Sequence, residues 1–139
     1  MKIFLDESCN MKIVTAVRAM FQDHTFLVAG IDSEKGILDI PLYPIVADLG
    51  CEVYICADNG QLDTRPAERA ACRKAGLHWV GLRKVPAKGK RGATADAARL
   101  IAAFLHILDD IKGAGGPRYY RLERGPKNAD EAIDEVGEL

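Results

Sequence analysis

The sequence predicts a single α/β domain built on a parallel sheet, and three observations support this prediction. The chain has 139 residues, which is the commonest size of one domain. Short β-branched and apolar runs alternate with amphipathic stretches of about ten residues, as in strands that are joined by helical crossovers. The run from Glu52 to Ala57 is almost continuously apolar, which is typical of a parallel strand covered on both faces.

Five segments are expected to form strands. Each is rich in β-branched, aromatic or other apolar residues and is followed by turn-forming or charged residues. They are Lys2 to Leu5, His24 to Ala29, Glu52 to Ala57, Leu77 to Leu82 and, as a late edge strand, Arg118 to Leu122. The third of these is the most apolar, so we expect it at the centre of the sheet.

Four helices are expected between these strands, at about residues 10–21, 39–49, 66–75 and 93–112. Asn10 is a suitable N-cap for the first helix. Pro44 should distort the first turn of the second helix, because proline lacks the N–H group that a helix interior uses. Pro66 suits the first turn of the third helix, and Gly76 should end it. Residues 84–92 then form a basic, glycine-containing loop.

The composition argues against several classes of protein. The four cysteines form no Cys-x-x-Cys pair and have no histidine at ligand spacing, which argues against structural zinc. No apolar stretch approaches the roughly 20 residues of a membrane span, and Met1 to Glu7 lacks the features of a signal peptide. We therefore expect a cytoplasmic protein with free thiols. We expect one domain over residues 1–124, and an acidic C-terminal tail over residues 125–139 that is mobile or weakly helical.

The formal net charge of -1 hides an uneven distribution of charge. The segment from Arg65 to Arg91 is rich in lysine and arginine and contains a single acid, Glu68. A basic segment of this kind suits a partner that carries phosphate groups. A solvated face without any partner is equally consistent with the charge pattern.

Three aspartates should meet at one edge of the sheet. Asp6 and Asp58 follow the first and third expected strands, and Asp39 begins the helix that leads into the third. Carboxylates that lie close together repel one another unless a cation neutralises them. Their hard oxygen atoms suit Mg²⁺ or Mn²⁺, which can activate water for attack on a phosphodiester. The alternative is that these aspartates only cap helices and turns.

Several stretches of the chain resemble the PIN-like branch of the VapC-type toxins. They are Met1 to Glu7, Leu38-Asp39 to Gly50, Cys56-Ala57-Asp58 and, above all, Thr64 to Arg69 continuing to Gly76-Leu77. The resemblance covers about the first hundred residues, and the later Gly-Gly-Pro-Arg-Tyr-Tyr-Arg-Leu is similar to the family's ending. It implies a PIN-like fold, which is a three-layer α/β/α arrangement around a mainly parallel sheet. It also implies metal-dependent endonucleolytic cleavage of RNA.

The resemblance assigns roles to individual residues. Asp6, Asp39 and Asp58 match the acids that bind metal and act in catalysis, Glu7 matches a neighbouring acid, and Asp63 could be a fourth metal ligand. Since a nuclease needs cations to hold the RNA backbone, the RNA-binding candidates are Arg65, Arg69 and Lys84. A cognate antitoxin protein is implied by the family alone, and a homodimer stays open.

Two other functions stay open as alternatives. Ser8-Cys9 and Cys56-Ala57 depart from the family pattern, which suits a non-catalytic PIN-like module that binds RNA or protein. A phosphoacceptor receiver domain also has an acidic pair after its first strand and an aspartate after its third. It further needs a hydroxyl residue and a lysine at later strand ends. Here Lys84 comes late, and no hydroxyl residue closes an intervening strand.

Overall fold

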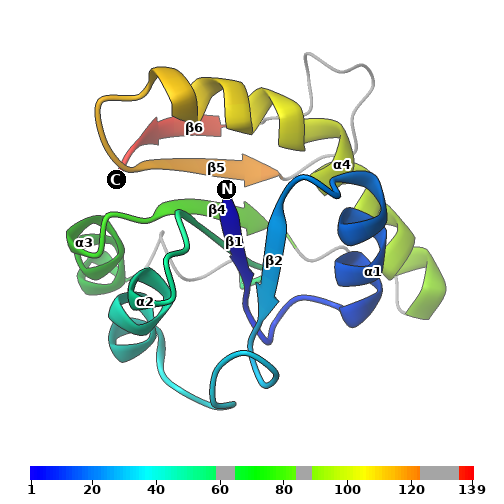
Figure 1. Cartoon of the computed structure of the whole chain (residues 1–139), viewed down its shortest axis with the longest axis horizontal. Helices are drawn as coiled ribbons and strands as arrows, with labels where there is room; N and C mark the ends of the chain where they lie inside the picture. Colours follow the sequence, from blue (N-terminus) through cyan, green and yellow to red (C-terminus); the bar gives the residue numbers. More distant parts are fainter. Residues whose placement is uncertain (59–64, 84–88, 123–134) are drawn as a thin grey trace.

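The structure is a computed structural model, which describes residues 1–58, 65–83, 89–122 and 135–139. Within these ranges, strands and helices alternate along most of the chain (Figure 1). In chain order the elements are β1 (Lys2–Leu5), α1 (Met11–Met20), β2 (Thr25–Val28), α2 (Asp39–Asp48), β3 (Val53–Cys56), α3 (Pro66–Lys74), β4 (His78–Leu82), α4 (Gly89–Gly113), β5 (Arg118–Leu122) and β6 (Glu135–Glu138). Each of the five predicted strands is present, within one residue of its predicted bounds.

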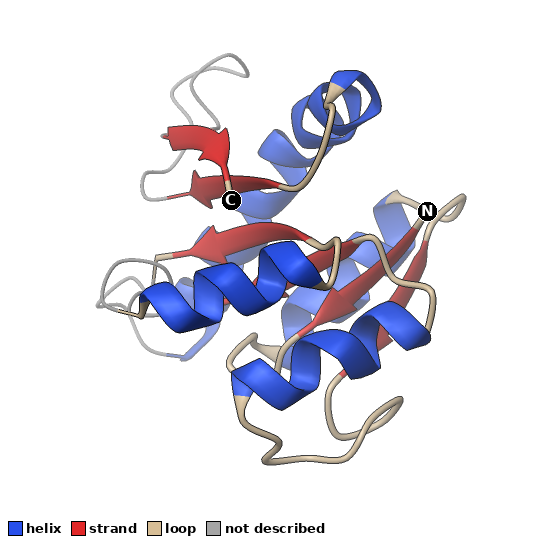
Figure 2. Ribbon diagram, turned by 90° about the vertical axis from the view of Figure 1, so that its left-hand side faces the viewer, coloured by secondary structure: helices blue, strands red, loops and turns tan. Residues whose placement is uncertain are grey.

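The strands form one six-stranded sheet in the order β2-β1-β3-β4-β5-β6. The first five strands in this order, β2, β1, β3, β4 and β5, are parallel to one another. Strand β6 runs antiparallel to β5. Helices α2 and α3 lie in front of the sheet in Figure 2, and α1 and α4 lie behind it. The predicted three-layer α/β/α fold with a mainly parallel sheet is therefore confirmed, and β3 lies inside the sheet as expected.

Each face of the sheet carries its own apolar core. Successive side chains of a strand point to opposite faces, so Ile55 packs with Phe104 of α4 on one side. Tyr54 packs with Tyr43 of α2 on the other side. All four side chains of β3 are buried between the two layers of helices. This double burial explains why the sequence of β3 is continuously apolar.

Local signals explain most of the helix ends. The side chain of Asn10 caps α1 as predicted, because its Oδ1 accepts a hydrogen bond of 3.0 Å from the N–H group of Lys12. Pro44 lies inside α2, yet the helix continues to Asp48. The inner face of α2 buries Leu42 and Val46, and this packing offsets the loss of one backbone hydrogen bond.

None of the described helices combines the length and the apolar character that crossing a membrane requires.

Two expectations about the later part of the chain are wrong. Helix α4 begins at Gly89, so residues 89–92 belong to a helix and not to the basic loop, while residues 84–88 lie outside the described residues. Residues 135–138 form β6, not a tail or a helix, so β5 is not the edge strand. The ring of Tyr119 lies over Gly137, where a Cβ atom would collide with it, and Leu139 is buried. Residues 123–134 lie outside the described residues.

Candidate functional site

Asp6, Asp39 and Asp58 line one open pocket of about 440 Å³. Asp6 follows β1, Asp58 follows β3, and these strands are neighbours in the sheet, so both residues lie at the same edge. Asp39 comes to this edge as the first residue of α2. The structure therefore brings together the three aspartates that the sequence singles out. The remaining lining consists of Glu7, Ser8 and the loop residues 35–38.

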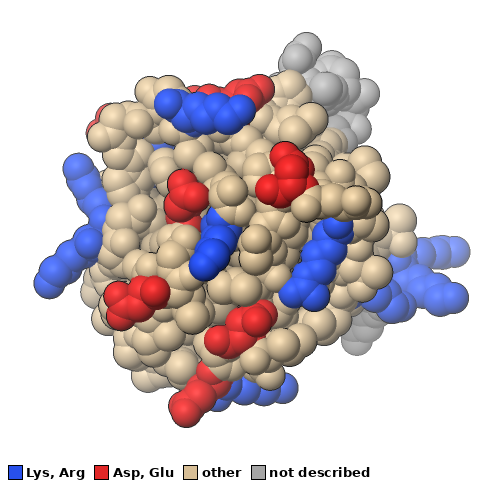
Figure 3. All heavy atoms as spheres, viewed as in Figure 1, with Lys and Arg blue, Asp and Glu red and all other residues tan. Residues whose placement is uncertain are grey.

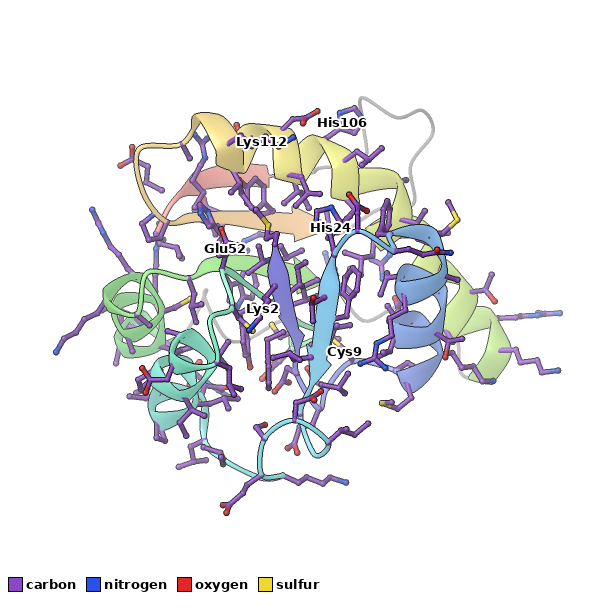
Figure 4. The ribbon with its side chains drawn as sticks, in the orientation of Figure 1. Lys2, Cys9, His24, Glu52, His106 and Lys112 are labelled. Atoms are coloured by element: carbon purple, nitrogen blue, oxygen red, sulfur yellow. The ribbon has the colours of Figure 1, made fainter. Side chains whose placement is uncertain are left out.

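Ser8 fixes the carboxylate of Asp6, which is 8% exposed. The N–H group and the Oγ hydroxyl of Ser8 both donate hydrogen bonds to Oδ2 of Asp6, over 3.0 and 2.5 Å. The same Oγ accepts a hydrogen bond of 2.9 Å from the N–H group of Ala57. Ser8 thus joins the ends of β1 and β3 while it orients Asp6. The Sγ atom of the next residue, Cys9, which Figure 4 labels, donates a hydrogen bond of 3.5 Å to the backbone oxygen of Ile55 in β3.

Tyr54 of β3 orients the carboxylate of Asp39. Its hydroxyl donates a hydrogen bond of 3.3 Å to Oδ1 of Asp39. Burial raises the pKa of Tyr54 well above its ordinary value, so its hydroxyl keeps its proton and stays a donor. The ring of Tyr43 packs edge-on against Tyr54 at a centroid distance of 5.1 Å. The position of Asp39 is therefore coupled to the packing of α2 on β3.

Arg65 lies among three carboxylates. Its Nη1 atom is 3.8 Å from Oδ2 of Asp39, 3.8 Å from Oδ2 of Asp58 and 3.2 Å from Oε1 of Glu68. Asp39 and Glu68 are mostly buried, whereas Arg65 and Asp58 are partly exposed. The hydrogen bond with Glu68 raises the pKa of Arg65, so its guanidinium group keeps its charge. The side chain of Arg65 is thus a counter-charge of the acidic cluster, which consists of Asp39, Asp58 and Glu68.

Glu68 is the least expected member of this cluster. It lies in the first turn of α3, is 9% exposed, and its Oε2 atom is buried without a hydrogen-bond partner. Burial raises the pKa of Glu68, and the nearby charges of Asp39 and Asp58 raise it further, while the hydrogen bond from Arg65 lowers it. The carboxyl group of Glu68 therefore shares the Nη1 atom of Arg65 with Asp39 and Asp58, while its own Oε2 atom stays without a partner.

A loop closes one side of the pocket. Oε2 of Glu7 accepts a hydrogen bond of 3.1 Å from the N–H group of Gly36. Gly36 has φ +80°, a left-handed conformation that favours glycine at this turn. Lys35, immediately before it, is exposed and lines the pocket. Glu7, predicted as the acidic neighbour of Asp6, therefore holds the loop that brings Lys35 to the pocket.

The other predicted site residues lie elsewhere or outside the described residues. The guanidinium group of Arg69 lies 4.9 Å from the ring centre of Tyr119 and donates a hydrogen bond to the backbone oxygen of Glu138. Arg69 thus contacts β5 and β6, although it is one helical turn from Arg65. Asp63 and Lys84 lie outside the described residues. Arg65 and Arg69 therefore contact different parts of the fold, and Figure 3 shows acidic and basic side chains interspersed on the face in view.

The described histidines take part in packing or lie at the surface. The ring of His24 meets Phe104 edge-on at 5.7 Å, at the side of β2 that faces α4 in Figure 4. Nδ1 of His78 accepts a hydrogen bond of 3.2 Å from the N–H group of Arg118. His106 is exposed on α4. The acidic pocket has no histidine among its lining residues, so carboxylates and cations determine its chemistry.

The residues of the pocket suit a hard cation in their chemistry. Carboxylate oxygen atoms are the ligands that Mg²⁺ and Mn²⁺ prefer, and a positive ion would neutralise the cluster that includes the unpartnered Oε2 of Glu68. As the chain stands, however, its described residues contain no group of three or more His, Cys, Asp or Glu side chains that could hold a metal ion.

Sequence reasoning missed Ser8, Tyr54 and Glu68 as members of the site. Ser8 directly follows the acidic pair, and Glu68 is the single acid in the basic segment, so both carried a signal in the sequence. Tyr54 carried none, because an aromatic residue in an apolar strand is ordinary. Comparisons with protein-family models, with curated proteins and with solved structures found no match to this chain.

Proposed function

We propose that this chain is a metal-dependent endoribonuclease with a PIN-like fold, in which Asp6, Asp39 and Asp58 bind one or two Mg²⁺ or Mn²⁺ ions. One observation carries the proposal: three carboxylates from separate elements line one open pocket at the carboxyl edge of a parallel sheet. Ligands of open α/β sheets bind at this edge, outside the ends of the strands. The resemblance to VapC-type toxins supports the same function.

Some residues at the pocket would bind the metal ion, and others would bind the substrate. When bound, a divalent ion would supply an activated water molecule and neutralise the charge that develops on the leaving oxygen. Ser8 and Tyr54 hold the carboxylates of Asp6 and Asp39 in position. Lys35 and Arg65 carry exposed or partly exposed positive charge at the pocket, where a phosphodiester would lie.

RNA is the proposed substrate. This choice is based on the resemblance to VapC-type toxins and on the openness of the pocket. An open pocket accepts a segment of a long polymer from the side. Arg69 and Lys84 stay proposed contacts to the RNA backbone, and Asp63 stays a proposed metal ligand. A cytoplasmic location and a cognate antitoxin protein follow from the resemblance alone and belong to the same proposal.

Cleavage of a mixed pool of labelled RNA tests the proposal directly. The purified chain should cut RNA with Mn²⁺ or Mg²⁺ and should stop cutting when EDTA is added, because the carboxylates act only through the bound ion. Cleavage that is unchanged in EDTA would contradict the metal-dependent mechanism. Absence of cleavage by the folded chain with either metal would contradict the nuclease itself.

One observation favours a second candidate, a non-catalytic PIN-like module that binds RNA or protein. Arg65 already supplies a positive charge to Asp39 and Asp58, so the acidic cluster has a counter-charge without any metal ion. Calorimetric titration with Mn²⁺ separates the candidates. The nuclease requires binding in the millimolar range or tighter, whereas the module is favoured if the folded chain binds no ion there.

A further inference from the structure

The position of Arg65 bears on how the pocket would accept a divalent ion. A single nitrogen atom, Nη1 of Arg65, lies within 3.8 Å of carboxylate oxygen atoms from Asp39, Asp58 and Glu68. Two of these, Asp39 and Asp58, line the pocket itself. The guanidinium group therefore occupies a point from which a cation reaches three carboxylates that come from α2, from the end of β3 and from α3.

One guanidinium group does not satisfy this cluster. Among the described residues, the three carboxylates share one nitrogen atom of one guanidinium group. The buried Oε2 atom of Glu68 has no hydrogen-bond partner. A divalent ion would neutralise the cluster more completely than one guanidinium group does, since its charge is twice as large.

The guanidinium group and a divalent ion cannot share this place, because two cations at such short range repel each other. Arg65 can leave at low cost. Its side chain is 49% exposed, and partly exposed ion pairs contribute little to stability. Arg65 is also the N-cap residue of α3, but its side chain makes no capping hydrogen bond, so the helix does not depend on where the side chain lies.

We infer that Arg65 is the internal counter-ion of the acidic pocket and that it competes with the divalent ion for Asp39 and Asp58. The inference rests on the proposed function for the identity of the ion. It adds that Arg65 lowers the affinity of the pocket for this ion. An ion that enters must displace the guanidinium group from both aspartates. The affinity of the pocket for the ion should therefore be weaker than the carboxylates alone would give.

Calorimetric titration of the full chain with Mn²⁺, in the absence of RNA, tests this competition. Arg65→Gln removes the competing charge and should bind Mn²⁺ about five-fold more tightly than the parent chain. Arg65→Lys keeps a positive charge and should stay near the parent. Arg73→Gln is the matched control, because Arg73 is exposed on the same helix and the substitution changes net charge equally. This control should leave the affinity for Mn²⁺ unchanged, which excludes a general effect of net charge.

Several outcomes would overturn the inference. It falls if Arg65→Gln binds Mn²⁺ as the parent does or more weakly, if Arg73→Gln tightens binding equally, or if neither the parent nor Arg65→Gln binds Mn²⁺. The titration contains no RNA, so its result is separate from the test of cleavage. Tighter binding by Arg65→Gln would support the inference even in a chain that cuts no RNA. Unchanged binding would overturn it even in an active nuclease.

Discussion

The Oγ atom of Ser8 lies 2.5 Å from Oδ2 of Asp6 and bonds at the same time to the backbone of the neighbouring strand end. One small side chain thus orients a carboxylate of the pocket and joins β1 to β3. Ser8 therefore makes a structural contact at the site.

Replacing Ser8 by alanine should weaken both the fold and the site. The N–H group of Ala57 and Oδ2 of Asp6 would lose a partner, so the free energy of unfolding should fall by about 1–2 kcal/mol. Urea denaturation measures this change. Ser33→Ala is the control, because the hydroxyl of Ser33 donates its hydrogen bond to the backbone oxygen of the adjacent, exposed Glu34. Equal stability of the two variants would refute the role of Ser8.

Gly81 should not tolerate a side chain. A Cβ atom at this position would overlap the ring of Trp79, which lies over Gly81 on the same face of β4. Gly81→Ala should lower the free energy of unfolding by about 2 kcal/mol. Since Trp79 is the single tryptophan, its displacement should also shift the fluorescence spectrum. Gly113→Ala, whose Cβ atom meets no neighbour within 4 Å, should change neither quantity in this direction.

Arg99 should be essential for stability. Its side chain is 1% exposed, pairs with Asp96, and donates hydrogen bonds of 2.8 and 2.6 Å to the backbone oxygens of Leu122 and Arg83. It thus attaches the ends of β4 and β5 to α4. Arg99→Met leaves a mostly buried carboxylate and two carbonyl groups without this partner. The free energy of unfolding should fall by about 3 kcal/mol or more.

The matched control for Arg99 is Arg91→Met, which removes an exposed arginine near the start of the same helix. This substitution should change the free energy of unfolding by less than about 0.5 kcal/mol. Denaturation curves for the three chains under one set of conditions provide the comparison. Equal losses of stability in the two variants would show that the contacts of Arg99 do not stabilise the fold.

His78 should make stability depend on pH. Burial lowers its pKa below the ordinary value of 6.5, and its unprotonated Nδ1 accepts the hydrogen bond from Arg118. The unfolded chain therefore binds a proton at this position more readily than the folded chain. The free energy of unfolding should then fall as the pH drops below about 6.5 towards the lowered pKa of the folded state.

Denaturation between about pH 7.5 and about pH 5 tests the role of His78. His78→Gln should lose less stability over this range than the parent chain, because it has no proton to bind. The exposed His106 supplies the control, and His106→Gln should follow the parent. If His78→Gln has the same pH dependence as the parent, the proposed titration of His78 does not contribute.

Elements with local or repeated signals could be predicted from the sequence. The apolar run of β3 and the cap at Asn10 are short-range features, and both are present. Strand β6 was missed because Glu135–Glu138 has no alternation of apolar and polar residues. Its place depends on contacts of Gly137 and Leu139 with residues earlier in the chain. Such long-range pairing leaves little trace in the local sequence.

The same distinction applies to the site. Asp6, Asp39 and Asp58 could be selected because parallel strands bring their carboxyl ends to one edge. The contact of Arg65 with two of these aspartates and with Glu68 could not, since it depends on how α3 packs beside α2. The contact of Arg69 with Tyr119 likewise depends on tertiary packing. The charge pattern of the sequence does not show that Arg65 contacts carboxylates while Arg69 contacts an aromatic ring.

The rate at which the chain cleaves RNA in Mn²⁺, measured alongside Asp58→Asn and Asp48→Asn, tests the central claim most directly. Asp58 lines the pocket, whereas Asp48 is an exposed aspartate at the end of α2, so the two variants change charge equally. Asp58→Asn should abolish cleavage and keep the fold, while Asp48→Asn should cut like the parent. Cleavage by Asp58→Asn at the parental rate would contradict a catalytic role of the pocket.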